Sequence, residues 1–113
     1  MTRSGRSTPK AKPLTTPLDR EEATRLAAIF KPLADPSRVA LISALADAEV
    51  CVHELADQFG MEQSAVSHQL RILRAQNLVT TRRQGRHIYY TLTDTHVRGI
   101  FEYALEHARH PRG

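Results

Sequence analysis

The sequence predicts a mainly α-helical domain with one β-hairpin, in the order α-α-α-α-β-β-α. Helix-capping signals recur along residues 19–77, a tight turn containing Gly60 joins two helical segments, and two alternating segments flank Gly85. Two helices joined by such a turn form a helix-turn-helix. Because a β-ribbon follows the helical core, the expected fold is a winged helix-turn-helix, in which the hairpin is the wing.

The chain has 113 residues, which is enough for one domain. Residues 1–17 are rich in Thr, Ser, Pro, Lys and Arg and contain no acidic residue, so they are expected to form a disordered basic arm. Residues 18–113 are expected to form the folded domain. Since a core of this size is small, pairing of two copies as a homodimer would enlarge it.

Capping signals define the first two helices. The first helix is expected to begin near Asp19, with acidic residues in its first turn, and to end at Pro32. Asp35 then caps a second helix, and Pro36 takes its first position, where the missing N–H of proline costs nothing. Apolar residues at helical spacing give each helix a face to bury.

The third and fourth helices form the helix-turn-helix. Residues 50–52 are expected to be extended and residues 53–59 helical, with Gly60 in the left-handed position that ends the helix. The fourth helix is expected to run from Gln63 to Gln76, and Asn77 can end it. Its expected inward face consists of Ala65, Val66, Leu70, Leu73 and Ala75.

A hairpin and a last helix complete the domain. Residues 78–83 and 87–92 alternate as strands around a turn at residues 84–86. The last helix is expected to run from about Asp94 to Arg109. No apolar run approaches the ~18 residues of a membrane span, and the N-terminus lacks the apolar stretch of a signal peptide. Because the single cysteine, Cys51, has no internal partner, the expected location is a reducing cytoplasm.

Charge is distributed unevenly along the chain. No Asp or Glu occurs between Glu62 and Asp94, although this span includes the fourth helix and the hairpin. The basic residues of the same span are Arg71, Arg74, Arg82, Arg83 and Arg86. A cation-only stretch in an otherwise neutral domain indicates a face for a polyanion, whereas the simpler interpretation of a charge run alone is a solvated surface.

The fourth helix is expected to be the recognition helix for DNA. A helix fits the major groove, and its first residues reach base edges. Gln63 is expected to hydrogen-bond adenine, and Ser64 and Ser67 are expected to hydrogen-bond bases or phosphates. The simpler interpretation of the two serines is helix capping and solvation. His68 and Arg71 are expected to contact phosphate. The expected contacts of the wing to phosphate or to the minor groove come from Arg82, Arg83 and Arg86.

The last helix carries a candidate metal site made of Asp94, His96, His107 and His110. His96 and His107 are about three turns apart and face the same way, but about 16 Å separates them along the helix axis. Ligands that lie ~2.0–2.1 Å from one zinc ion cannot be so far apart. Two antiparallel copies of the helix would close two such sites, each shared between the subunits of a homodimer.

Three imidazoles and one carboxylate suit tetrahedral Zn²⁺, and Co²⁺ is an alternative. With no open coordination position, such a site is expected to sense metal rather than to catalyse a reaction. The simpler interpretation is that these are polar residues at the ends of a helix, where histidine also favours the helix dipole.

Four segments of the chain resemble the ArsR/SmtB family of metal-responsive repressors. They are LADPSR (33–38), CVHELA (51–56), SAVSHQL (64–70) and QGRHIYY (84–90). The resemblance covers residues 20–110, and the spacing of the candidate ligands is similar to that of the zinc-sensing branch. It implies that the metal-free dimer binds operator DNA with inverted-repeat symmetry, and that zinc lowers this affinity and derepresses genes for metal efflux or sequestration. It also implies that His107, once ligated, bonds a backbone carbonyl near Asn77.

The chain departs from two branches of that family. Lead and cadmium sensors use a Cys-x-Cys pair where this chain has Cys51-Val52-His53, and residues 1–20 contain no Cys or His, so Cys51 is expected to be a small buried residue. Nickel-sensing relatives add ligands from terminal extensions. Here the basic arm has no histidine and the chain ends three residues after His110, which favours zinc over nickel and leaves cobalt open.

Alternative functions follow from the same residues. A cobalt or nickel sensor could use the same site, and a winged-helix repressor could act without any metal. A redox sensor would normally need a second thiol besides Cys51. An enzyme is not expected, because the sequence has no nucleophile–base arrangement and no phosphate-binding glycine loop.

Overall fold

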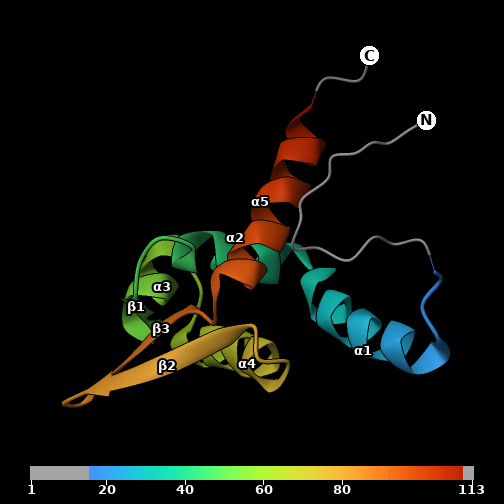
Figure 1. The fold of residues 1–113 in the computed structure, drawn as a ribbon. Coiled ribbons are helices and arrows are strands. Elements are labelled where there is room, and N and C mark those ends of the chain that lie inside the picture. The colour runs from blue at the N-terminus through green and yellow to red at the C-terminus, as the bar shows by residue number, and fades with distance from the viewer. Residues whose placement is uncertain (1–15, 111–113) are drawn as a thin grey trace.

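The computed structural model describes residues 16–110, so the predicted basic arm lies almost entirely outside the described residues, as do residues 111–113. The described elements, in order, are α1 (Arg20–Phe30), η1 (Lys31–Leu33), α2 (Pro36–Leu45), β1 (Val50–Cys51), α3 (Val52–Phe59), α4 (Gln63–Ala75), β2 (Val79–Gln84), β3 (His87–Leu92) and α5 (Thr95–Arg109). This order confirms the predicted winged helix-turn-helix (Figure 1). The short helix η1 was not predicted, whereas β1 forms within the segment 50–52 that was expected to be extended.

Side-chain caps begin three of the helices. The carboxylate of Asp19 accepts a hydrogen bond from the backbone N–H of Glu22 at 2.8 Å. The carboxylate of Asp35 accepts one from the N–H of Arg38 at 3.1 Å, and Pro36 occupies the first position of α2. A helix start leaves several N–H groups without helical partners, and a capping carboxylate satisfies one of them. Asp94 caps α5 in the same way.

The core lies where α2, α3 and α4 pack against the wing, the hairpin of β2 and β3 (Figure 1). Its fully buried large side chains are Leu41, Ile42, Leu45, Leu55, Val66, Leu70, Leu73 and Val79. Truncating a leucine of this kind to alanine costs about 2–5 kcal/mol. The orientation of α4 is therefore fixed by the core, and its opposite face is left to solvent.

The sheet has three antiparallel strands in the order β1-β3-β2. Strand β1 pairs only with the middle of β3, through Cys51↔Tyr89 and its neighbouring pair. The wing continues beyond this point as a two-stranded ribbon to the pair Gln84↔His87. Gly85 turns the ribbon with φ +63°, the positive value that a type II′ turn needs at its first central residue.

Three local expectations require correction. Val52 belongs to α3 rather than to an extended segment. Ala65 and Ala75 are exposed, although both were expected to face inward. Helix α4 ends at Ala75, one residue early, and Asn77 stops the chain from continuing as a helix with φ 59°. Small side chains gain little from burial, so alanines are weak indicators of which face is inward.

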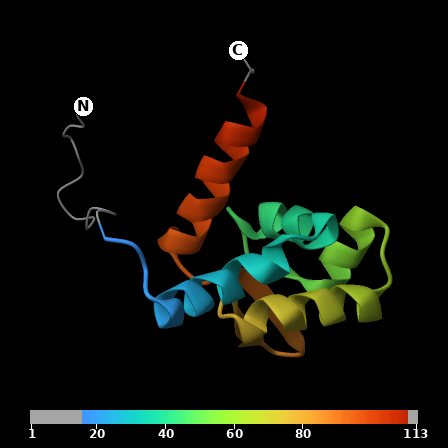
Figure 2. The same ribbon diagram turned by 90° about the vertical axis from the view of Figure 1, so that its right-hand side faces the viewer.

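The two terminal helices, α1 and α5, bury none of their residues in the single chain. Figures 1 and 2 show α5 rising away from the layer formed by the other elements. An apolar groove of about 410 Å³ lies between α5 and the residues around η1 and α2, including Phe30 and Ala104. Within residues 16–110, every helix falls short of the length and apolarity that crossing a bilayer requires.

Candidate nucleic-acid interface and metal-binding residues

The outward face of α4 is polar and accessible. Val66, Leu70 and Leu73 are fully buried, so the helix presents the opposite side to solvent. The predicted recognition residues on that side are exposed, apart from the half-buried Ser67: Gln63, Ser64, Ser67, His68 and Arg71. Side chains of these types, near the start of an exposed helix, can hydrogen-bond both base edges and phosphates.

Two contacts position α4, and neither was predicted. The guanidinium of Arg38 donates from Nε to Oε1 of Gln69 at 2.7 Å and from Nη1 to the carbonyl of Pro32 at 3.1 Å. This links α4 to α2 and η1. At the start of α4, the side-chain amide of Gln63 lies 3.2 Å from Nδ1 of His53, on α3. Arg38 and Gln69 are 31 residues apart, and Gln63 and His53 belong to different helices, so no pattern within one helix indicates these contacts.

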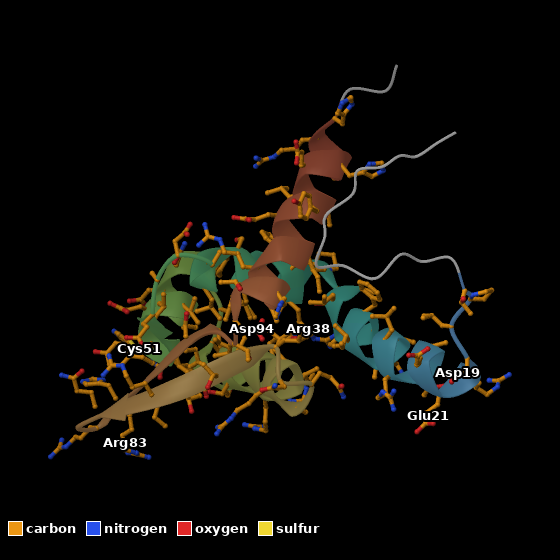
Figure 3. The ribbon with its side chains drawn as sticks, in the orientation of Figure 1. Asp19, Glu21, Arg38, Cys51, Arg83 and Asp94 are labelled. Carbon is orange, nitrogen blue, oxygen red and sulfur yellow. The ribbon has the colours of Figure 1, made fainter. Side chains whose placement is uncertain are left out.

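The wing carries its free cations near the tip. Arg83 and Arg86 are exposed, and no carboxylate among residues 16–110 forms an ion pair with either of them. Figure 3 shows Arg83 on the hairpin, projecting away from the core. Both guanidinium groups are therefore accessible to a polyanion, and their contact with DNA stays a prediction.

Arg82 differs from these neighbours, because its guanidinium is already paired with a carboxylate. Its Nη2 lies 2.8 Å from Oε1 of Glu49, and its Nε lies 3.0 Å from each oxygen of the same carboxylate. Hydrogen bonding to Arg82 lowers the pKa of Glu49, and the same contact raises the pKa of Arg82. Glu49 lies outside the acid-free span and 33 residues from Arg82, so no pattern in the sequence indicates this pair.

The first half of the predicted metal site lies at the start of α5, at the base of the helix in Figure 3. Oδ1 of Asp94 accepts the N–H of Val97 at 3.0 Å, whereas Oδ2 lies 3.6 Å from Nδ1 of His96. The hydrogen bond from Val97, more than the nearby His96 ring, lowers the pKa of Asp94. The carboxylate is thus ionised at neutral pH, with one oxygen left for a further ligand.

The second half of the predicted site lies at the other end of α5. His107 and His110 are exposed, and the backbone N–H of His110 donates to the carbonyl of His107 at 3.2 Å. Within residues 16–110, the single chain brings together no group of three His, Cys, Asp or Glu residues that could hold a metal ion. The structure therefore keeps the two halves apart, as expected from the rise of the helix.

The single cysteine, Cys51, lies in β1 and is buried, as predicted for a small residue that packs in the core.

Comparison with known proteins identifies the family. Residues 35–81 match the model described as bacterial regulatory protein, arsR family. The HTH-type transcriptional regulator NmtR of Mycobacterium tuberculosis is 44% identical over 106 residues, which cover 94% of this chain and 84% of NmtR. The chain belongs to the ArsR/SmtB family. A transcriptional repressor SmtB homolog of Synechocystis is 51% identical over 87 residues, which cover 77% of this chain and 66% of that relative.

Solved structures of this family share the fold. The solution structure of apo-NmtR has a TM-score of 0.74 and 41% identity, covering 96% of this chain and 91% of that one. The homodimeric winged helix-turn-helix DNA-binding domain Mb0332 of Mycobacterium bovis has a TM-score of 0.73 and 29% identity, covering 88% and 98%. In this ArsR/SmtB-family chain, the matched residues 35–81 include all of α4 and the first half of β2, so they cover the helical part of the candidate interface but not the tip of the wing.

Proposed function

We propose that this ArsR/SmtB-family chain is a metal-sensing transcriptional repressor that binds operator DNA as a homodimer and releases it when zinc binds. The observation that carries the proposal is the separation of two ligand pairs at opposite ends of α5, a helix that buries none of its residues in one chain. An antiparallel second copy would cover the helix and complete both sites. The relative Mb0332, whose solved structure is a homodimer, supports this pairing of two chains.

The residues present fit a zinc ion shared by two chains. Asp94 and His96 are already close to one another, and both side chains are accessible, at 49% and 91% exposure. His107 and His110 of the second copy would supply two more imidazole ligands. This set gives Zn²⁺ the four nitrogen and oxygen ligands that it prefers, and the ion would supply a cross-link between the two helices. Cobalt or nickel at the same residues is the alternative, which a titration with each metal distinguishes.

DNA binding is assigned to the exposed face of α4 and to the tip of the wing. The early residues of α4 are proposed to read base edges, and Arg71, Arg83 and Arg86 to contact phosphates. In a dimer, two copies of α4 would face half-sites about one turn of DNA apart. Linking the α5 helices would fix the angle between the two α4 helices, so a metal that favours another angle lowers DNA affinity.

The proposal is tested by replacing one ligand. We expect His107→Gln to bind a DNA duplex, selected from a random-sequence pool by the wild-type protein, as tightly as wild type does. Zinc should release the wild-type protein from this duplex but leave the variant bound. Glu106→Gln, a neighbouring change on α5 outside the proposed site, is the control and should respond like wild type. A His107→Gln protein that zinc still releases would show that the site is wrong.

A further inference from the structure

We propose that Glu49 and Arg82 form a brace that fixes the direction of the wing, and that Arg82 supports DNA binding through this brace rather than by contacting phosphate. The inference rests on the proposed DNA-binding function and changes the role of one of its predicted contacts. The brace consists of the Glu49–Arg82 pair together with Tyr89 and Gln84, which contact the same guanidinium.

The contacts of Arg82 involve all three nitrogens of its guanidinium group. Nε and Nη2 both donate to the carboxylate of Glu49, at 2.8–3.0 Å, and Nη1 donates to Oε1 of Gln84 at 2.8 Å. The central carbon of the group lies 5.2 Å from the centre of the Tyr89 ring. A guanidinium that has a two-oxygen carboxylate partner and an aromatic face is held in one orientation, unlike a flexible surface cation.

The position of the brace explains what it can control. Arg82 pairs in register with Tyr89, and Tyr89 pairs with Cys51, so these residues form the last row in which the sheet has three strands. The next pairs toward the tip, Arg83↔Ile88 and Gln84↔His87, belong to a two-stranded ribbon. Two-stranded ribbons are marginally stable by themselves and twist readily. The brace crosses the sheet at the point where the ribbon loses its third strand.

Arg82 also differs in charge compensation from the two arginines nearer the tip of the wing. The carboxylate of Glu49 compensates Arg82, while Arg83 and Arg86 have no such partner among residues 16–110. A phosphate approaching Arg82 would have to displace Glu49 or accept its repulsion. The two arginines nearer the tip can contact phosphate directly, and their position depends on the direction that the brace gives to the ribbon.

The decisive variant is Glu49→Gln, because the two roles of Arg82 predict opposite signs. Removing an acidic residue from a DNA-binding protein ordinarily strengthens binding to a polyanion. The brace predicts instead that Glu49→Gln weakens binding to the selected duplex, at fixed salt, by about two- to fivefold. The matched control is Glu62→Gln, at the exposed N-cap position of α4, where the side chain makes no capping bond. We expect this control to bind as tightly as wild type or more tightly.

A double-mutant cycle separates the brace from a phosphate contact. If Arg82 acts through Glu49, the double variant Glu49→Gln/Arg82→Gln should bind no more weakly than Arg82→Gln alone. If Arg82 contacts phosphate, the two single changes should have opposite effects that add. Equal or tighter binding by Glu49→Gln, or additive effects of opposite sign, would overturn the inference.

Hydrogen exchange of the DNA-free protein tests the brace directly. We expect the amides of residues 83–88 to exchange faster in both single variants, while those of α4 and the thermal unfolding midpoint stay close to wild type. Unchanged exchange in the wing would contradict the brace. A wild-type protein that selects no duplex would overturn the proposed function, whereas wild-type binding that Glu49→Gln leaves intact would overturn the brace alone.

Discussion

Asp94 shows how one side chain can serve both folding and a proposed ligand set. One carboxylate oxygen caps α5 through the N–H of Val97, and the other lies toward His96. The cap lowers the pKa of Asp94. The contribution of the ionised carboxylate to stability is therefore present above the ordinary carboxyl pKa, and it is lost as the pH falls through the lowered value. At neutral pH the carboxylate is therefore charged and suited to a metal ion.

The two roles of Asp94 can be separated by Asp94→Asn. Asparagine is as good an N-cap as aspartate, but its neutral amide is a poorer ligand for zinc. We expect the thermal unfolding midpoint and the metal-free DNA affinity to stay close to wild type, while release from DNA requires at least about tenfold more zinc. Asp19→Asn, which changes the cap of α1, is the control. Release of Asp94→Asn at the wild-type zinc concentration would remove this residue from the ligand set.

At the scale of elements, the features that the sequence predicts well are those encoded within a few residues. Asp35 and Pro36 start α2 where expected, and Gly60 ends α3 in the left-handed conformation. Pairing between distant segments left no such signal. The addition of β1 to the hairpin, the Arg38–Gln69 contact and the Glu49–Arg82 pair join residues about thirty or more positions apart. Only packing of the core brings those partners together.

The end of α4 offers a test of local encoding. Asn77 adopts φ 59°, a conformation that asparagine and glycine tolerate and that β-branched residues do not. We expect Asn77→Val to lower the free energy of unfolding by about 1–2 kcal/mol, and Asn77→Gly to leave it nearly unchanged, in urea denaturation. Equal destabilisation by the two variants would mean that the side chain of Asn77, and not its backbone conformation, ends the helix.

At the scale of the whole molecule, the described chain has features that one copy leaves unpartnered. Helices α1 and α5 bury no residue, the groove beside α5 is apolar, and Tyr103 on α5 is 77% exposed. Apolar surface of this kind is the usual mark of an interface. The sequence predicted the separation of the ligand pairs from helix geometry alone, because the rise per residue is fixed. It could not predict which other surface the second copy covers.

Each proposed metal site is shared between two chains, and mixing two defective variants tests this sharing most directly. His96→Gln and His107→Gln each damage both sites of a homodimer. A mixed dimer regains one intact site. The His107→Gln chain supplies Asp94 and His96 to this site, and the His96→Gln chain supplies His107 and His110.

After random subunit exchange, half of the dimers are mixed. Each mixed dimer has one of its two metal sites intact. We therefore predict about a quarter of the wild-type zinc-binding capacity in the mixture, and little in either variant alone. A mixture that binds no more zinc than its components, or a single variant that binds as much as wild type, would contradict the shared site.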